Sequence, residues 1–350
     1  MIDFSQIPKE EKERKPTQPS DSAENISFSS FPPKESSGEK ISFSEAGKDL
    51  SLDKDLVLSQ GYLQAKEAYQ EALSLAESIL MGSFSSSQIN QAKAIVESFI
   101  GFTEKGEQEL LSFVFSPSSY PVHYLSLNLV NVCILSLEIG LWLGFRRDAL
   151  FKLGLASLLH DVGMSAFLDL ANQPKSLSLS DFQKIKIHPQ KGRELLREVN
   201  LGREEDVLLA VEQEHERFNG SGYPKGLRGE EIIELAQIIG FVDVYEALTH
   251  KRPYRPAFSP EEAIKIMLSK KDSFSSKVGK AFLEKIGLYP KGIIVELNTK
   301  EIGYVIRHSP KTPTSPWVKV LFDSQGKRLP KSKEIDLSKS PAVYIIKTRI

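Results

Sequence analysis

The 350-residue sequence predicts a mainly α protein with a small β-barrel or β-sandwich at its C-terminus and a disordered N-terminal tail. Three observations lead to this fold class. Between about 51 and 288, apolar residues recur at intervals of three and four, as on one face of a helix. From 289 onward, short β-branched runs alternate with turn residues. Residues 1–50 are rich in Ser, Lys, Glu and Pro, with too few apolar side chains to offset the entropy of ordering.

The N-terminal region, 51–109, is predicted to be helical, with one helix from 52 to a stop near Gly82 and a second over 87–102. Dimerisation to a homodimer and simple scaffolding are equally open as roles for this pair. In the tail, the sequence Ile-Ser-Phe-Ser occurs at 26–29 and again at 41–44. This repeat is either a low-complexity coincidence or a docking motif for another surface, such as that of a signalling protein.

The main body, 110–288, is predicted to be an all-helical bundle, because no alternating strand pattern interrupts it. Ser180 with Gln183, and Ser259 with Glu262, have the spacing of a capping box. Pro260 occupies the favoured first position of the helix that follows Ser259. These residues predict two helix starts.

The apolar segment 124–145 is long enough to span a membrane. It contains Asn128, Asn131 and Glu138, which are costly in lipid, so a buried core helix is the better interpretation.

The single cysteine, Cys133, suits a reducing compartment, and we expect a cytoplasmic protein without a membrane partner. The formal net charge of −1 gives no electrostatic footprint for duplex nucleic acid.

The C-terminal region, 289–350, is predicted to be a small β domain. Its candidate strands are 292–297, 302–306, 317–322 and 343–346, separated by Asn, Gly, Pro and Ser. A cap on the helical core is favoured over a separate binding module.

The pair His160-Asp161 closes an apolar helix-like run, 149–159. Burying such groups costs several kcal/mol unless they are paired or bind a metal. Further histidines and acids follow the same pattern of polar groups in apolar or helix-end positions: His123, His188, Glu214, His215 and Asp243. Together they form the ligand inventory of a site for two divalent metal ions.

Such a site suits phosphodiester hydrolysis, which needs a nucleophile at neutral pH and stabilisation of charge on phosphoryl oxygens. Two ions can supply a bridging hydroxide and polarise the phosphate. Asp161 is the natural bridging carboxylate, because its neighbour His160 can bind one ion while its own oxygens span both. Asp243 is the expected second carboxylate, and imidazoles complete shells that tolerate Fe, Mn, Co or Zn.

The motifs His-Asp-Val-Gly at 160–163, Ile-His-Pro-Gln-Lys-Gly at 187–192 and Glu-His-Glu-Arg-Phe-Asn-Gly-Ser-Gly-Tyr-Pro at 214–224 occur in this order. With Asp243 and the following Arg-Pro-Tyr-Arg, they resemble the HD-GYP family of the HD phosphohydrolase superfamily, over roughly 110–288. The resemblance implies a bacterial phosphodiesterase that hydrolyses cyclic di-GMP to linear pGpG or to GMP. It also implies two divalent ions per chain, Fe or Mn, with Zn, Co and Ni as alternatives.

The resemblance also assigns residues. One ion would be held by His123, His160, Asp161 and Asp243, and the other by Asp161, His188, His215 and Glu214, with His160 and Asp161 as the catalytic pair. The loop containing Gly222, Tyr223 and Pro224 would shape the nucleotide site, although Gly and Pro also suit a plain turn. Arg252 and Arg255 either contact phosphate or pair with acidic neighbours, and the sequence leaves both open.

Five positions depart from the family pattern. Met164 stands where a lysine is usual, Glu214 where a histidine is usual, and Asn219 and Glu246 where aspartates are usual. Ser119 replaces the glutamate that holds a third metal in some members, so two ions are expected. The departures leave open a working but slow phosphodiesterase, a degenerate member that acts as a cyclic di-GMP receptor or protein-interaction module, and another HD-type phosphohydrolase.

Overall fold

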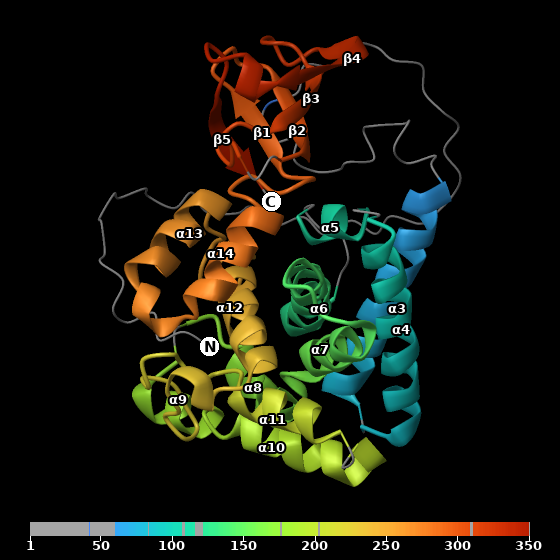
Figure 1. Ribbon diagram of the computed structural model, residues 1–350, viewed down its shortest axis with the longest axis vertical. Helices are drawn as coiled ribbons and strands as arrows, with labels where there is room; N and C mark the ends of the chain where they lie inside the picture. Colours follow the sequence, from blue (N-terminus) through green and yellow to red (C-terminus); the bar gives the residue numbers. More distant parts are fainter. Residues whose placement is uncertain are drawn as a thin grey trace, which may run out of the picture.

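The computed structural model describes residues 42, 60–82, 84–106, 109–115, 122–175, 177–201, 204–308 and 311–349 (Figure 1). Nearly all of the predicted tail, including the first copy of its repeat, and the predicted helix start at 52 lie outside these residues. Ser119 lies outside them as well.

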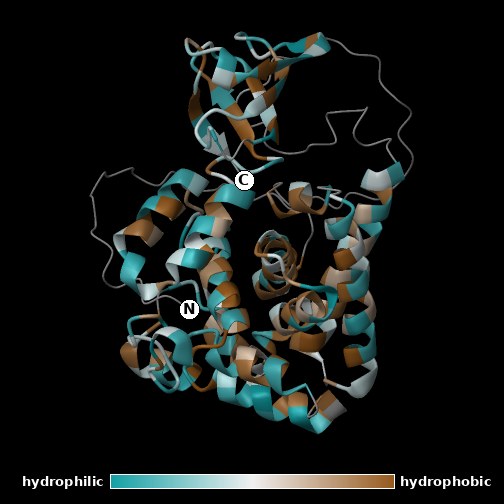
Figure 2. Ribbon diagram, viewed as in Figure 1, coloured by the Kyte–Doolittle hydropathy of each residue, from teal (hydrophilic) through white to brown (hydrophobic). Residues whose placement is uncertain are grey.

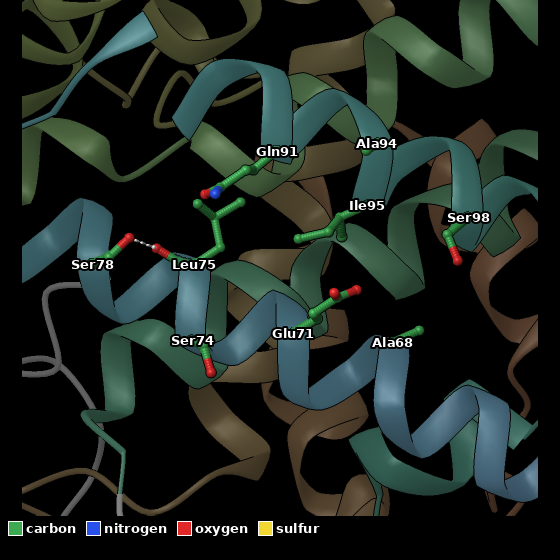
Figure 3. A pocket seen from close by; sticks show the side chains of 9 residues that line it. All are labelled: Ala68, Glu71, Ser74, Leu75, Ser78, Gln91, Ala94, Ile95 and Ser98. Carbon is green, nitrogen blue, oxygen red and sulfur yellow. Dashed lines mark hydrogen bonds between the residues drawn. The ribbon is translucent and has the colours of Figure 1, made fainter. Parts of the chain in front are cut away.

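The two N-terminal helices, α3 (Gln60–Met81) and α4 (Ser86–Glu104), lie side by side along one edge of the helical body (Figure 1). Each buries a stripe of apolar side chains, and these join the same hydrophobic core as the helices that follow. A groove of about 360 Å³ runs between them, with Leu75 and Ile95 inside it and Ser74, Ser78 and Ser98 along it (Figure 3). The predicted helix pair therefore packs on the body as part of one core.

The regular elements in the described part of the body are all helices, as predicted. Its α-helices are α5 (Glu109–Val114), α6 (Tyr124–Trp142), α7 (Arg147–Leu159), α8 (Leu168–Ala171), α9 (Leu179–Ile185), α10 (His188–Leu196), α11 (Glu205–Gln213), α12 (Glu234–Thr249), α13 (Pro260–Ser269) and α14 (Ser276–Lys285). Short irregular helical turns are η3 (Val162–Phe167), η4 (Arg197–Leu201), η5 (Gly229–Glu231) and η6 (Lys271–Ser273).

The predicted capping box at Ser259 is confirmed, since its hydroxyl accepts the Glu262 N–H and the Glu262 side chain accepts the Ser259 N–H. The other predicted start is wrong by two residues. Ser178, rather than Ser180, is the N-cap of α9, and its hydroxyl accepts the Asp181 N–H. Both serines precede an acceptor side chain at suitable spacing, so the sequence alone could not separate them.

Helix α6 lies in the middle of the body (Figure 2). It is long and apolar enough to cross a membrane, as is the stretch Arg147–Ala171, but 83% of its most apolar window is buried inside the protein. Neighbouring helices, including α3, α7 and α12, pack around it. The structure accounts for its apolar character as that of a core helix.

The C-terminal unit is one antiparallel sheet, β4-β3-β2-β1-β5 in order, made of β1 (Ile294–Leu297), β2 (Ile302–Arg307), β3 (Trp317–Phe322), β4 (Arg328–Asp336) and β5 (Ile345–Arg349). A small β unit is confirmed, but the sheet is open rather than closed into a barrel. The sequence missed β4, because this exposed strand carries charges and Pro330 instead of alternating apolar residues. The ring of His308 donates to the Glu284 carbonyl at 3.1 Å, which ties the sheet to α14.

Candidate metal centre

Ends of three helices converge on the motif residues. His160 ends α7, and Asp161 follows it at the start of η3. His188 is the first residue of α10, while Glu214 and His215 directly follow α11. Because loops leave a helix at its ends, side chains there can point across at one another without continuing the helical packing. Asp243 comes instead from the interior of α12.

Four of the predicted ligands form one tight cluster: Asp161, His188, Glu214 and His215, whose ligand atoms lie within 4.8 Å of one another. Asp161 Oδ1 lies 3.0 Å from His188 Nε2. His215 Nε2 lies 3.1 Å from both His188 Nε2 and Glu214 Oε1. The spacing is that of groups able to share one ion.

His160 and Asp243 lie at the edge of this cluster. His160 Nε2 is 3.8 Å from Asp161 Oδ2 and 3.9 Å from Asp243 Oδ1. All three side chains are buried. The structure therefore brings six predicted ligands together around Asp161, the residue expected to bridge two ions.

Hydrogen bonds to the backbone fix the tautomers of two histidines. Nδ1 of His160 donates to the Ser157 carbonyl at 2.7 Å, and Nδ1 of His188 donates to the Ile185 carbonyl at 2.8 Å. A carbonyl only accepts, so each Nδ1 carries a proton, and the neutral form of each ring presents the lone pair of Nε2 to the cluster. This is the orientation in which histidine binds a metal.

The electrostatics of the cluster favour a cation. Burial lowers the pKa of His188, but the charges of Asp161 and Glu214 outweigh burial and raise it to about 9. Burial also raises the pKa of Glu214, and the nearby Asp161 and Asp243 add to this effect. Three carboxylates in one buried site repel one another unless positive charge lies between them.

Unmatched acceptors point the same way. In the described part of the chain, His160 Nε2 and Glu214 Oε2 are buried without a hydrogen-bond partner, and Asp161 Oδ1 has only His188 Nε2 beside it, at 3.0 Å. Leaving such groups unsatisfied is costly, and a divalent ion accepts electron pairs from all three. The residues therefore fit a metal centre.

Gly163 sets the separation between the two halves of the site. A Cβ on this residue would lie 2.0 Å from the His188 carbonyl oxygen and 2.7 Å from the Gly192 nitrogen. Only glycine allows η3 and the start of α10 to touch through their backbones. The glycine of the His-Asp-Val-Gly motif is thus required for Asp161 to reach His188.

His123 is not part of the cluster in this structure. It is the N-cap of α6, where its Nδ1 accepts the Leu125 N–H at 3.2 Å. Its Nε2 contacts Asn172 Oδ1. Both ring nitrogens are engaged by protein groups, so the assignment of His123 as a ligand stays a prediction.

The loop with Gly222, Tyr223 and Pro224 packs directly on the ligands. The Tyr223 N–H donates to the His215 carbonyl at 3.1 Å, and the two rings lie 4.7 Å apart. A Cβ on Gly222 would lie within 2.5 Å of the backbone of His215 and Glu216, so glycine is necessary here. The buried Glu216, which stands in the same motif but was assigned no role from the sequence, accepts three backbone N–H groups from residues 225–227 and holds the end of the loop.

The two arginines have different surroundings. Arg252 is buried and donates to Glu246 Oε2 at 2.7 Å. Arg255 donates to the carbonyls of Ala247, Leu248 and Pro256, near the end of α12. Pairing with an acidic neighbour is thus observed for Arg252, while Arg255 contacts backbone at this helix end.

A small pocket opens beside the cluster, lined by Tyr124, Leu125, Asn128, Asp161, Met164, His188, His215, Asp243, Ala247, Arg252 and Tyr254. Its free volume of about 30 Å³ matches roughly one water molecule. A pocket of this size can hold a metal ion or a water molecule bound to it. Any larger group would have to lie across its rim.

The departures from the family pattern are accommodated differently. Met164 is buried and lines this pocket, where a lysine would present a charge. Asn219 is exposed, and its Oδ1 accepts the Ser221 N–H at 3.1 Å, a turn-forming role that an aspartate also fills. Glu246 is buried and fully engaged by Asn128, Asn131 and Arg252.

Two family models match the chain. Residues 118–278 match an HD domain, and residues 294–349 match a KOW domain associated with the HD domain. The chain is 34% identical over 221 residues to the cyclic di-GMP phosphodiesterase PA4108 of Pseudomonas aeruginosa, covering 62% of this chain and 52% of that protein. The chain therefore contains an HD domain, and this relative agrees with the resemblance of its motifs to the HD-GYP family.

Two further comparisons agree with this resemblance. Cyclic di-GMP phosphodiesterase PdeB of Borreliella burgdorferi is 26% identical over 221 residues, covering 63% of this chain and 58% of its own length. The chain thus spans slightly more than half the length of these relatives. The solved structure of Bd1817, a HDG"Y"P protein from Bdellovibrio bacteriovorus, matches with a TM-score of 0.51 at 20% identity, covering 68% of this chain and 76% of that one, which supports the fold alone.

Proposed function

We propose that this chain is a metal-dependent phosphodiesterase of the HD-GYP type that hydrolyses cyclic di-GMP to linear pGpG or to GMP. The observation that carries the proposal is the cluster of buried, mutually facing acceptors around Asp161. The names of its relatives support the substrate class, since they are cyclic di-GMP phosphodiesterases or, in Vibrio cholerae, a 3′3′-cGAMP-specific phosphodiesterase that is 36% identical over 126 residues, 36% of this chain and 29% of that protein.

In this proposal, one ion is held by His160, Asp161 and Asp243 with His123, and the other by Asp161, His188, Glu214 and His215. Bound divalent ions, Fe or Mn by the chemistry of the ligands, supply Lewis acidity toward phosphoryl oxygens and lower the pKa of the attacking water. Tyr223 packs on the His215 ring and keeps its orientation.

The nucleotide binds across the rim of the pocket in this proposal. Arg252, whose charge Glu246 compensates, lies at the pocket wall and faces the phosphates. The loop containing Gly222, Tyr223 and Pro224 borders the nucleotide. Cyclic dinucleotide signalling and the reduced state of Cys133 suit a cytoplasmic protein.

The test is hydrolysis by protein loaded with Fe(II) or Mn(II), with cyclic di-GMP and 3′3′-cGAMP in separate reactions and products resolved by chromatography. We expect linear product from cyclic di-GMP, lost when Asp161→Ala is introduced. Asp169→Ala changes an exposed acid eight residues away and should retain activity. Tight nucleotide binding without any product would replace the hydrolase with a receptor.

A further inference from the structure

A second buried polar cluster adjoins the metal centre. Asp243 and Glu246 in it are positions of the sequence motifs, but Asn128, Asn131 and Tyr69 are not. Helix α6 presents Asn128 and Asn131, one turn apart, to Asp243 and Glu246, one turn apart on α12. Nδ2 of Asn128 donates to Asp243 Oδ1 at 3.0 Å and to Glu246 Oε2 at 2.6 Å. Both protons of this amide are therefore used on the two carboxylates.

The cluster continues into the N-terminal helix. Nδ2 of Asn131 donates to Glu246 Oε1 at 3.1 Å, and Oδ1 of Asn131 accepts the hydroxyl of Tyr69 at 2.8 Å. Tyr69 lies on α3, ahead of residues 118–278 that match the HD domain. A chain of hydrogen bonds thus leads from α3 through α6 to a predicted metal ligand on α12.

The groups of this chain are buried, with 0% of Asn128, 1% of Asn131, 1% of Glu246 and 0% of Tyr69 exposed. Hydrogen bonds are strong in such surroundings. They hold one arrangement of the Asn128 amide, because the reversed amide would set its oxygen against two carboxylates. Asp243 Oδ1 is consequently fixed 3.9 Å from His160 Nε2. Removal of a group that hydrogen-bonds to a metal ligand and orients it typically weakens metal binding about 10- to 100-fold.

We propose that Asn128 is a positioning residue for Asp243, and that Tyr69, through Asn131 and Glu246, makes α3 a working part of the metal centre. The inference rests on the proposed metal-dependent function. It gives the helix that precedes the HD domain a direct influence on ion affinity, so that displacement of α3 weakens binding of the ion held by Asp243.

The experiment is a calorimetric titration of the full chain with Mn²⁺, together with thermal unfolding of the metal-free protein. Asn128→Ala should weaken binding of one ion about 10- to 100-fold. Tyr69→Phe, which removes a single hydroxyl and retains the fold, should weaken it about 2- to 10-fold. Ser126→Ala is the matched control on α6, because the Ser126 hydroxyl is equally buried and has no hydrogen-bond partner among the described residues.

The outcomes separate the two proposals. If the wild-type chain binds no Mn²⁺, the proposed function fails. If the wild-type chain binds and both variants bind with the affinity of Ser126→Ala, the metal centre stands and the positioning role is overturned. A lower melting temperature with unchanged Mn²⁺ affinity also overturns it, since that is the result of a purely structural network.

Discussion

Glu246 and Glu214 are both buried near Asp243, but they differ in their hydrogen-bond partners and in the direction of their pKa shifts. Glu246 has partners for both oxygens, and although burial raises its pKa, His250, Arg252 and the two asparagines lower it below the ordinary value. Glu214 has an oxygen without a hydrogen-bond partner in the described part of the chain, and its pKa is raised by burial. The difference indicates that Glu246 is a satisfied member of the hydrogen-bond network behind Asp243, whereas the unsatisfied oxygen of Glu214 marks the place for a cation.

The largest test of this contrast is removal of Glu246. Glu246→Ala leaves the Arg252 guanidinium buried without its partner, and breaking a buried pair in this way costs about 3–5 kcal/mol. We expect the free energy of unfolding of the metal-free protein, measured in urea, to fall by this amount. The exposed Glu67→Ala should change it by less than about 0.5 kcal/mol. A loss for Glu246→Ala below about 1 kcal/mol would contradict the structural role.

Metal binding at the cluster of Asp161, His188, Glu214 and His215 should raise the free energy of unfolding. An ion at about 100 times its dissociation constant adds about 2.7 kcal/mol, because it binds only the folded state. We therefore expect Mn²⁺ to raise the melting temperature of the wild type by several degrees and EDTA to reverse the shift. An equal shift in Asp161→Ala would mean that the ion binds elsewhere.

Gly163→Ala tests the backbone contact between the two halves of the site. The added methyl overlaps the His188 carbonyl, so α10 must move, at a cost of about 1–3 kcal/mol. We expect lower stability and weaker Mn²⁺ binding in the same variant. Gly101→Ala, on α4, meets no atom within 4 Å and is the control. Equal metal affinity in Gly163→Ala and wild type would show that the contact is dispensable for the site.

Glu214→Gln tests the second glutamate of the comparison. It removes one of three neighbouring negative charges without changing shape, so the metal-free protein should be as stable as the wild type, within about 1 kcal/mol, or more stable. Its affinity for Mn²⁺ should fall. Destabilisation as large as that of Glu246→Ala would mean that the two glutamates are equivalent.

The smallest expected effect concerns Met164, which lies at the pocket wall. A lysine there can donate to phosphate, so Met164→Lys should raise the turnover of cyclic di-GMP if the loss of this group limits the reaction. An unchanged rate, measured at saturating substrate with bound metal verified, removes this explanation for a slow enzyme.

Much of the fold followed from local patterns. The helices of the body and the cap at Ser259 depend on periodicity and neighbouring side chains, which a sequence contains. Strand β4 did not follow, because its pairing with β3, and not its own residues, makes it a strand.

The site shows the same limit. Spacing identified His160, Asp161 and His188, but the role of Asn128 depends on the register between α6 and α12, which spacing does not encode. A signal was present, since Asn128 and Asn131 interrupt an apolar helix one turn apart, as Asp243 and Glu246 do. Two apolar helices that each carry a pair of polar residues one turn apart could have been predicted to face each other.

The contact of Gly163 with the first turn of α10 has a consequence for ion selection. The two main chains pack against each other there, so widening the gap between Asp161 and His188 for an ion with longer ligand bonds would separate them and lose this packing. We expect ions with short ligand bonds of about 2.0–2.2 Å to fit, and Ca²⁺, with bonds of about 2.3–2.6 Å, to be disfavoured. Gly163, which has no side chain, would then contribute to the selection of metal ions by size.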